Sequence, residues 1–261
     1  MRKFLLWGVV AGILLAGGVR TGYARTLNDV MASVEKGVTA LKDIKGTQVI
    51  KFAFEKDLIT AQNIFSAKTP NKFRAETLIT VPGKKQAQKV ITVCDGKYVW
   101  QHVLPPEEEK VIKMNLAEAP GVAAKYQKTF METGYGVVGV EDLLKLAGAD
   151  YDIKVSGSAK LDGKDVDVVE GMLKKGSSKA DAKAVSGWNL PVPARIKYQI
   201  GVKDGFIYKT EGFDKAGKLM LEISYKNLKF NTGLADSQFT FKAPRKVAVI
   251  DATEVLPGLG K

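Results

Sequence analysis

Turn signals at short intervals are the feature that most constrains the fold of this 261-residue chain. Pairs ending in glycine separate runs that are rich in β-branched and aromatic residues, and Asp-Gly supplies the positive φ angles that tight hairpins require. The pairs are Pro82-Gly83, Asp95-Gly96, Asp162-Gly163, Asp204-Gly205 and Ala216-Gly217. Around them we expect strands over 47–56, 59–68, 72–81, 87–94, 97–104, 109–115, 151–160, 164–173, 194–203, 206–213, 218–229 and 237–242. Short turns imply antiparallel pairing, and a sheet of this size should curl strongly or close.

Three segments have helical rather than strand character. Over 27–44, apolar residues recur at spacings of three and four, and Thr26 or Asn28 is a suitable cap. Two further helices are expected over 117–132 and 140–147. The predicted fold class is therefore α+β: a strongly curved antiparallel sheet, forming an unclosed β-barrel, with about three helices covering its concave face.

Residues 1–24 have the three-part layout of a secretory signal peptide. The segment has a basic start, an uncharged run from Phe4 to Val19, and small residues before an expected cleavage site after Ala24. The apolar run is shorter than the about 20 residues that a membrane-spanning helix needs. We therefore expect the signal to be cleaved and the protein to be exported.

The remainder, residues 25–261, is predicted to form one domain. A helical lid is expected over about 116–147 and a polar loop over about 174–190. Lys and Arg number 40 against 28 Asp and Glu, which gives a formal net charge of +12, but the basic residues form no long run. For an exported chain, this charge suits an anionic lipid surface, an acidic protein partner or simply a solvated surface, rather than nucleic acid.

Residues suited to catalysis or metal binding are few. His102 is the single histidine, in a strand-like run where a local hydrogen-bonding role is expected. Cys94 is the single cysteine, so no internal disulfide can form, and we expect it to be a small buried residue. No His/Cys cluster has metal-ligand spacing. The sequence therefore predicts a protein without catalytic residues, metal or cofactor.

The run Gly134-Tyr135-Gly136-Val137-Val138-Gly139 matches the G-x-G-x-x-G pattern of dinucleotide-binding sites. Such a site requires a strand before the first glycine, whereas a helix is expected there. We interpret the run as a flexible connector between two helices, with Gly134, Gly136 and Gly139 as the hinge of a moving lid.

Apolar side chains provide the candidate binding site. Those selected are Phe52, Phe54, Phe73, Trp100, Phe130, Met131, Leu143 and Leu144. Each of them is also compatible with an ordinary core position. Because a curved sheet capped by few helices can enclose more volume than its side chains fill, these residues are the predicted lining of a hydrophobic cavity.

Three short motifs, in order along the chain, resemble a known family. Pro70-Asn71-Lys72-Phe73-Arg74 resembles the P-x-x-F-R strand of the periplasmic outer-membrane lipoprotein carriers, the LolA-like family. Asp95-Gly96-Lys97-Tyr98-Val99-Trp100 is similar to their D-G-x-x-x-W hairpin. Phe239 to Pro244, followed by Val247 to Asp251, is similar to their closing strand. The resemblance covers nearly all of the chain after the signal peptide.

The resemblance implies an unclosed barrel of about eleven antiparallel strands, a size at which curling is expected, with helices as a lid. It implies a soluble, monomeric periplasmic carrier that binds the acyl chains of lipoproteins or lipids in a hydrophobic cavity and moves them toward the outer membrane. It further implies an inner-membrane release complex and an outer-membrane acceptor as partners, and no cofactor or nucleic acid. The alternative is a periplasmic lipid or lipoprotein sensor that regulates a membrane partner.

One position departs from the family pattern. The carriers have an arginine immediately before the proline of P-x-x-F, where it contacts the lid. Here Thr69 stands at that place and Lys68 precedes it. Because a one-residue shift moves a strand side chain to the other face, Lys68 is not expected to replace the arginine.

Overall fold

The computed structural model describes residues 25–54, 57–105, 108–118, 150–176 and 192–253. They contain one α-helix, α1 (Leu27–Ala40), one 3₁₀ turn, η1 (Asp236–Phe239), and twelve strands. The strands are β1 (Asp43–Phe54), β2 (Asp57–Lys68), β3 (Lys72–Thr80), β4 (Gln88–Asp95), β5 (Tyr98–Val103), β6 (Lys110–Asn115), β7 (Tyr151–Leu161), β8 (Lys164–Leu173), β9 (Arg195–Gly201), β10 (Ile207–Phe213), β11 (Leu219–Phe230) and β12 (Val249–Asp251).

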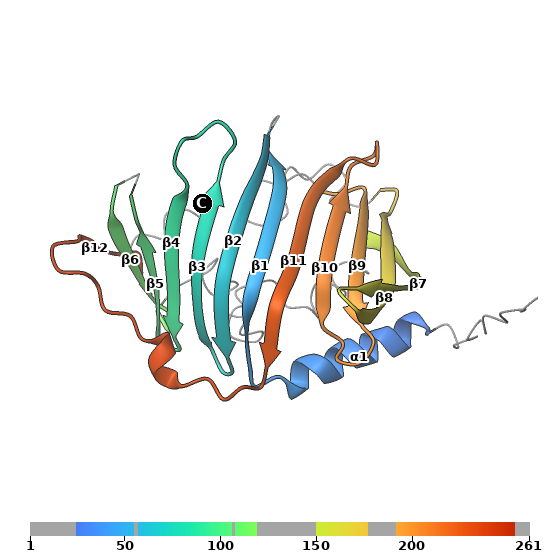
Figure 1. The fold of residues 1–261 in the computed structure, drawn as a ribbon, viewed down its shortest axis with the longest axis horizontal. Coiled ribbons are helices and arrows are strands. Elements are labelled where there is room, and N and C mark those ends of the chain that lie inside the picture. Colours follow the sequence, from blue (N-terminus) through green and yellow to red (C-terminus); the bar gives the residue numbers. More distant parts are fainter. Residues whose placement is uncertain (1–24, 55–56, 106–107, 119–149, 177–191, 254–261) are drawn as a thin grey trace, which may run out of the picture.

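All twelve strands belong to one unclosed, curved sheet in which neighbours along the chain are mostly neighbours in space (Figure 1). The order is β12-β6-β5-β4-β3-β2-β1-β11-β10-β9-β8-β7, and each pair is antiparallel except β12 with β6. The first long strand, β1, pairs with both β2 and β11 in the middle of the sheet. The predicted ladder of antiparallel hairpins is thus confirmed.

The end of the chain differs from the prediction. The strand expected over 237–242 is wrong: Asp236–Phe239 forms η1, and its Phe239 side chain is buried. Instead, the short strand β12 pairs in parallel with β6. Three residues in parallel pairing depend on the surface that they meet, so the turn signals and strand patterns of the sequence did not predict this pairing.

Helix α1 begins as predicted and ends earlier. Thr26 caps it through a capping box with Asp29, in which the Asp29 backbone N–H donates to the Thr26 hydroxyl and the Asp29 carboxylate accepts from the Thr26 N–H. The helix stops at Ala40, because Leu41 is extended and Ile44 already belongs to β1. The predicted end at residue 44 is therefore wrong.

α1 packs on the strands at one end of the sheet, near the lower ends of β8 to β10 (Figure 1). Its buried Val30 and Val34 belong to one hydrophobic cluster with Val169, Tyr198 and Ile200. This amphipathic packing is what the spacing of its apolar residues predicted. No helix within the described ranges is long and apolar enough to span a membrane.

Several predictions fall outside the described residues. About three helices were predicted, and the described residues contain α1 alone as an α-helix. The expected helices over 117–132 and 140–147 lie outside the described residues, except for Ala117 and Glu118, which belong to a turn. So do the signal peptide over 1–24, most of the polar loop over 174–190, and the predicted site residues Phe130, Met131, Leu143, Leu144, Gly134, Gly136 and Gly139.

Candidate functional site

The strand register divides the sheet into two chemically distinct faces. Ile44, Ala67, Phe73 and Cys94 stand side by side on β1 to β4 and point to one face. Ile50 lies on the same face of β1. Through β11 and β10 it is in register with Tyr198 of β9, which belongs to the hydrophobic cluster that includes α1. We call this side the α1 face. On β11 and β1 to β4 its members are Leu221, Ile223, Tyr225, Phe230, Ile44, Gln48, Ile50, Phe52, Ile59, Ala61, Asn63, Phe65, Ala67, Phe73, Ala75, Thr77, Ile79, Gln88, Val90, Thr92 and Cys94.

The opposite face has a ladder of alternating charges across β1, β11, β10 and β9. Glu222 pairs with Lys51 and Lys209 at 3.0 Å each, and Glu211 lies 2.9 Å from Lys209 and 3.7 Å from Lys197. Burial raises the pKa of the Glu222 carboxyl, but hydrogen bonds from Lys209 and Lys51 outweigh that effect and hold the pKa below its usual value. A row of ionised groups needs water or partners, so the α1 face is the one suited to apolar ligands.

The α1 face has two separate cores. The first lies on β7 to β10 and includes Val30 and Val34 of α1. The second lies on β1 to β4 around Phe65 and Phe73, and none of its described members is helical. Next to the second core, Ile50, Ile79 and Val90 are only half-buried. This half of the face is therefore the candidate site.

Phe52 and Phe73 both lie on the α1 face, and both are buried. They do not lie together, because Phe73 is in register with Ile44, eight residues before Phe52 on β1. At about 3.3 Å per residue, the two phenylalanines are about 26 Å apart along the strands. They would line opposite ends of one site. Phe54 is the last residue of β1 and pairs with Asp57.

Trp100 lies on the opposite face, away from the other predicted residues. It is in register with Val93, which pairs with Arg74, whereas Phe73 pairs with Cys94. The segment after η1 covers Trp100, whose ring centroid lies 5.4 Å from that of Phe241. We therefore leave Trp100 out of the candidate site.

His102 lies beside Trp100 under the same covering ring, with its centroid 6.1 Å from that of Phe241. Its Nε2 lies 2.9 Å from Oε1 of Glu109, and the histidine is buried. This is the local hydrogen-bonding role that the sequence favoured. No cluster of three His, Cys, Asp or Glu side chains suited to a metal occurs within the part of the chain that the structure describes.

Lys68 points away from the α1 face, as the one-residue shift predicted. It pairs with Asp43 in the register, on the opposite face, and its Nζ donates to the Leu234 carbonyl at 2.8 Å and to Asp236 at 2.7 Å. The Thr69 hydroxyl donates a hydrogen bond to the Lys42 carbonyl oxygen. Lys68 thus holds the segment after β11.

A row of polar side chains crosses the apolar half of the α1 face, and sequence reasoning missed it. Asn63 Nδ2 donates to Gln48 Oε1 at 2.6 Å, and Gln48 Nε2 donates to the Tyr225 hydroxyl at 2.8 Å. Burial raises the pKa of Tyr225 to about 12, so its hydroxyl is neutral near pH 7. Polar residues within strands are an available signal, but only the register shows that these three lie together.

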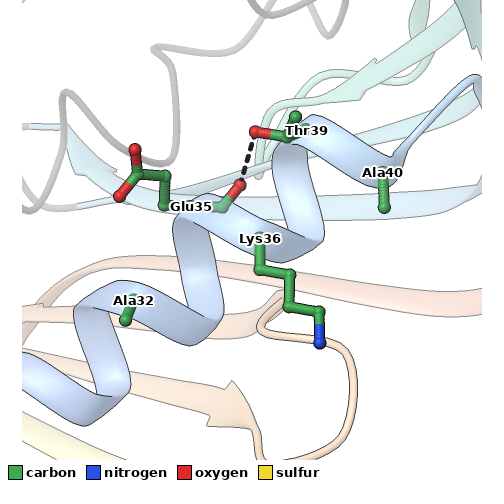
Figure 2. A pocket seen from close by; sticks show the side chains of 5 residues that line it. All are labelled: Ala32, Glu35, Lys36, Thr39 and Ala40. Atoms are coloured by element: carbon green, nitrogen blue, oxygen red, sulfur yellow. Dashed lines mark hydrogen bonds between the residues drawn. The ribbon is translucent and has the colours of Figure 1, made fainter.

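The structure has a shallow hollow on the outer side of α1, shown in Figure 2. Its lining residues are Ala32, Glu35, Lys36, Thr39 and Ala40, all from α1. The Thr39 hydroxyl donates to the Glu35 carbonyl within the helix. Since Val30 and Val34 face the sheet, the hollow lies on the solvent side and is separate from the apolar half of the α1 face.

Comparison with known proteins gives matches only among solved structures; no protein-family model and no curated protein sequence matches the chain. The chain is similar to an uncharacterized conserved protein from Thermus thermophilus, with a TM-score of 0.47 and 14% identity over 86% of this chain and 98% of that one. It is similar to one chain in a structure of the MucA/MucB complex from Pseudomonas aeruginosa, with a TM-score of 0.44 and 12% identity over 83% of this chain and 59% of that one. It is also similar to a LolA superfamily protein from Nitrosomonas europaea, with a TM-score of 0.30 and 15% identity over 84% of this chain and 99% of that one.

Proposed function

We propose that this protein binds the acyl chains of lipids or lipoproteins on the α1 face of β1 to β4 and carries them through the periplasm toward the outer membrane. The observation that supports this proposal most is the contrast between the two faces of one sheet. The α1 face of β1 to β4 has mostly apolar and no charged side chains, with half-buried Ile50, Ile79 and Val90, while the opposite face has a charged ladder. The three sequence motifs of the carrier family support the same function.

The dimensions of the face suit an acyl chain. β1 has 12 residues, which is about 40 Å at about 3.3 Å per residue. An acyl chain spans one leaflet, which is about half of the about 30 Å hydrocarbon thickness of a bilayer. The strands are therefore long enough for one chain to lie along them. Each CH₂ removed from water contributes about 0.8 kcal/mol, so burial of the tail supplies most of the affinity.

The partners follow from the proposed route. A carrier of this kind receives its cargo from an inner-membrane release complex and delivers it to an outer-membrane acceptor, and the signal-like leader over 1–24 would bring it to the periplasm. Removal of Arg2, Lys3 and Arg20 with the leader lowers the net charge from +12 to +9, and this basic charge favours docking on anionic lipid surfaces or acidic protein partners. The protein acts as a monomer, without a cofactor, and it performs no chemical step.

The experiment compares two substitutions at adjacent positions of β3. Leu78 is 45% exposed on the opposite face, and Ile79 lies on the α1 face in register with Ala61. Wild-type protein, Ile79→Glu and Leu78→Glu are purified from the periplasm of an expression host without detergent, and bound lipid is measured by native mass spectrometry. We expect acylated ligands on the wild type and on Leu78→Glu, and loss of them from Ile79→Glu.

Wild-type protein that carries no lipid and takes up no acylated peptide would refute the carrier function. Recovery of a membrane regulator with an empty protein would indicate a sensor instead. Equal lipid content in the two variants would refute the assignment of the α1 face, even if lipid is bound. Thermal unfolding of both variants serves as the control for folding.

A further inference from the structure

Two amide oxygens on the apolar half of the α1 face are buried and have no hydrogen-bond partner: Oδ1 of Asn63 and Oε1 of Gln88. Asn63 is in the middle of β2, and Gln88 begins β4. The strand between them, β3, connects their positions, since Thr77 pairs with Asn63 and Ile79 pairs with Gln88. By strand spacing and rise, their backbone positions are about 12 Å apart.

Both side chains are oriented so that the unpaired atom is an acceptor. The amide nitrogen of Asn63 donates to Gln48 Oε1, and Gln48 in turn donates to Tyr225. A flip of Asn63 alone would set its oxygen against Gln48 Oε1, with no proton between them; reversing the row would require Gln48 to flip as well and the Tyr225 hydroxyl to donate to it. Gln88 is fixed in the same manner, because its nitrogen donates to the carbonyl oxygens of Leu104 and Lys89. The face therefore presents acceptors and needs donors.

An unpaired buried acceptor destabilises the folded protein, and neither of these two oxygens has a hydrogen-bond partner. Leaving such a group unsatisfied costs about 1–3 kcal/mol, and folded proteins rarely do so. The flanking positions along the strands are apolar: Ala61 and Phe65 on either side of Asn63, and Val90 beside Gln88. Thr77 pairs with Asn63 across the strands, but its hydroxyl does not bond the Asn63 oxygen. Two such atoms on one face indicate a ligand that brings the missing hydrogen.

We propose that the ligand of the α1 face carries a hydrogen-bond donor, an N–H or an O–H, at the head of its acyl chain, and that Asn63 Oδ1 accepts this hydrogen, with Gln88 Oε1 as a second acceptor. This inference rests on the proposed function and narrows its ligand class. N-acyl amides and acyl glycerols with a free hydroxyl fit the site. Simple esters lack the donor, and a carboxylate would place its negative charge against two oxygens.

The test uses matched pairs of ligands on wild-type protein, measured by displacement of bound diphenylhexatriene. N-methylpalmitamide has an N–H and N,N-dimethylpalmitamide has none; monopalmitoylglycerol has hydroxyls and methyl palmitate has none. We expect the donor-bearing member to bind about three- to tenfold more tightly, the range that one net hydrogen bond supplies. A preference in the amide pair alone identifies N-acyl ligands, and one in the glycerol pair alone identifies hydroxyl-bearing ligands.

The variant Asn63→Leu removes the first acceptor and leaves Gln88, so it should reduce the preference between the two amides. Thr92→Val is the matched control, because it removes a hydroxyl from the same face of β4 and leaves Asn63 in place; it should retain the preference. Binding of every ligand to wild-type protein without preference would overturn this inference and leave the proposed function intact. Binding of none of them would overturn both. Because the wild-type comparison needs no variant, the result stands even if Asn63→Leu fails to fold.

Discussion

The backbone of Gly205, in the turn between β9 and β10, lies directly against the carbonyl oxygen of Ser33 in α1, and a Cβ at residue 205 would overlap that oxygen. Gly205 also has a φ of +65°, which suits glycine. The helix can approach the turn only because this residue has no side chain. We predict that Gly205→Ala lowers the free energy of unfolding by about 3 kcal/mol or more, since the left-handed conformation alone costs about 1–2 kcal/mol and the overlap adds to it. Urea denaturation measures the change.

The control for this prediction is Gly217→Ala. Gly217 has a similar φ of +82°, but no atom lies within 4 Å of the position that its Cβ would take. Its substitution should lower the free energy of unfolding by only about 1–2 kcal/mol, the cost of the left-handed conformation. Equal effects of the two substitutions would show that α1 does not rest on the turn as described.

Asp43, at the start of β1, is predicted to make stability depend on pH. Its carboxylate accepts from the backbone N–H groups of Thr232 at 2.7 Å and Gly233 at 2.8 Å, and from the Thr232 hydroxyl at 3.0 Å. Burial raises the pKa of Asp43, but these bonds outweigh burial and hold the pKa below its usual value of 3.8. A group with a lowered folded pKa stabilises above its unfolded pKa, and this contribution is lost as the pH falls through the folded value.

The variant Asp43→Asn keeps the size of the side chain but turns a donor toward the same backbone N–H groups. We expect a loss of about 2–3 kcal/mol near pH 7. We also expect a smaller further loss than in the wild type between about pH 5 and pH 3, because the titrating group is gone. Urea denaturation at these pH values measures both effects. Parallel pH profiles for the two proteins would contradict the role of Asp43.

Cys94 should resist alkylation in the folded protein. Its side chain is fully buried, its Sγ donates to the Asn71 carbonyl at 3.0 Å, and burial raises the pKa of the thiol to about 11. The reactive thiolate is then a very small fraction near pH 8. Iodoacetamide labelling followed by mass spectrometry should show slow modification without denaturant and rapid modification in urea. Rapid labelling of the folded protein would mean that the hairpin between β2 and β3 opens readily.

Lys68→Met should leave the affinity for acyl ligands within about twofold of the wild type, because Lys68 points to the opposite face and contacts Asp236. The substitution should instead loosen the segment after β11, and faster cleavage there by limited proteolysis would measure this change. Lys68→Arg is the control that retains the charge. A tenfold loss of ligand affinity in Lys68→Met alone would mean that this lysine does act on the binding face, as the arginine of the family does on its lid.

The hairpin order could be predicted from the sequence because tight turns have local chemistry. The expected positive φ angles occur at Gly96, at +97°, and at Gly163, at +78°. The start of α1 was predictable for the same reason, because its capping box uses two residues three apart. Its end was not, since Leu41 and Ile44 fit both the helical spacing and the strand that follows.

It was harder to predict which face of the sheet each side chain occupies, and this decides which residues form the candidate site. The sequence predicts which residues of β5 share a face with Trp100. Whether that face is also the face of Phe73 depends on the register of β3, β4 and β5. The hydrogen bond between Gln48 and Tyr225 joins residues 177 positions apart. No local pattern predicts such a pair, which is why the polar row could not be predicted from the sequence.

The central claim, that acyl chains lie on the α1 face, is tested most directly by photocrosslinking. The ligand is N-methylpalmitamide with a diazirine at the end of its chain, and tandem mass spectrometry locates the attached residues. We expect labelling of Ile50, Ile79 or Val90, which share the α1 face of β1, β3 and β4. Ile64, at 63% exposed, and Leu78, at 45%, are the internal controls on the opposite face. Labels on these two, or on neither face, would contradict the assignment of acyl chains to the α1 face.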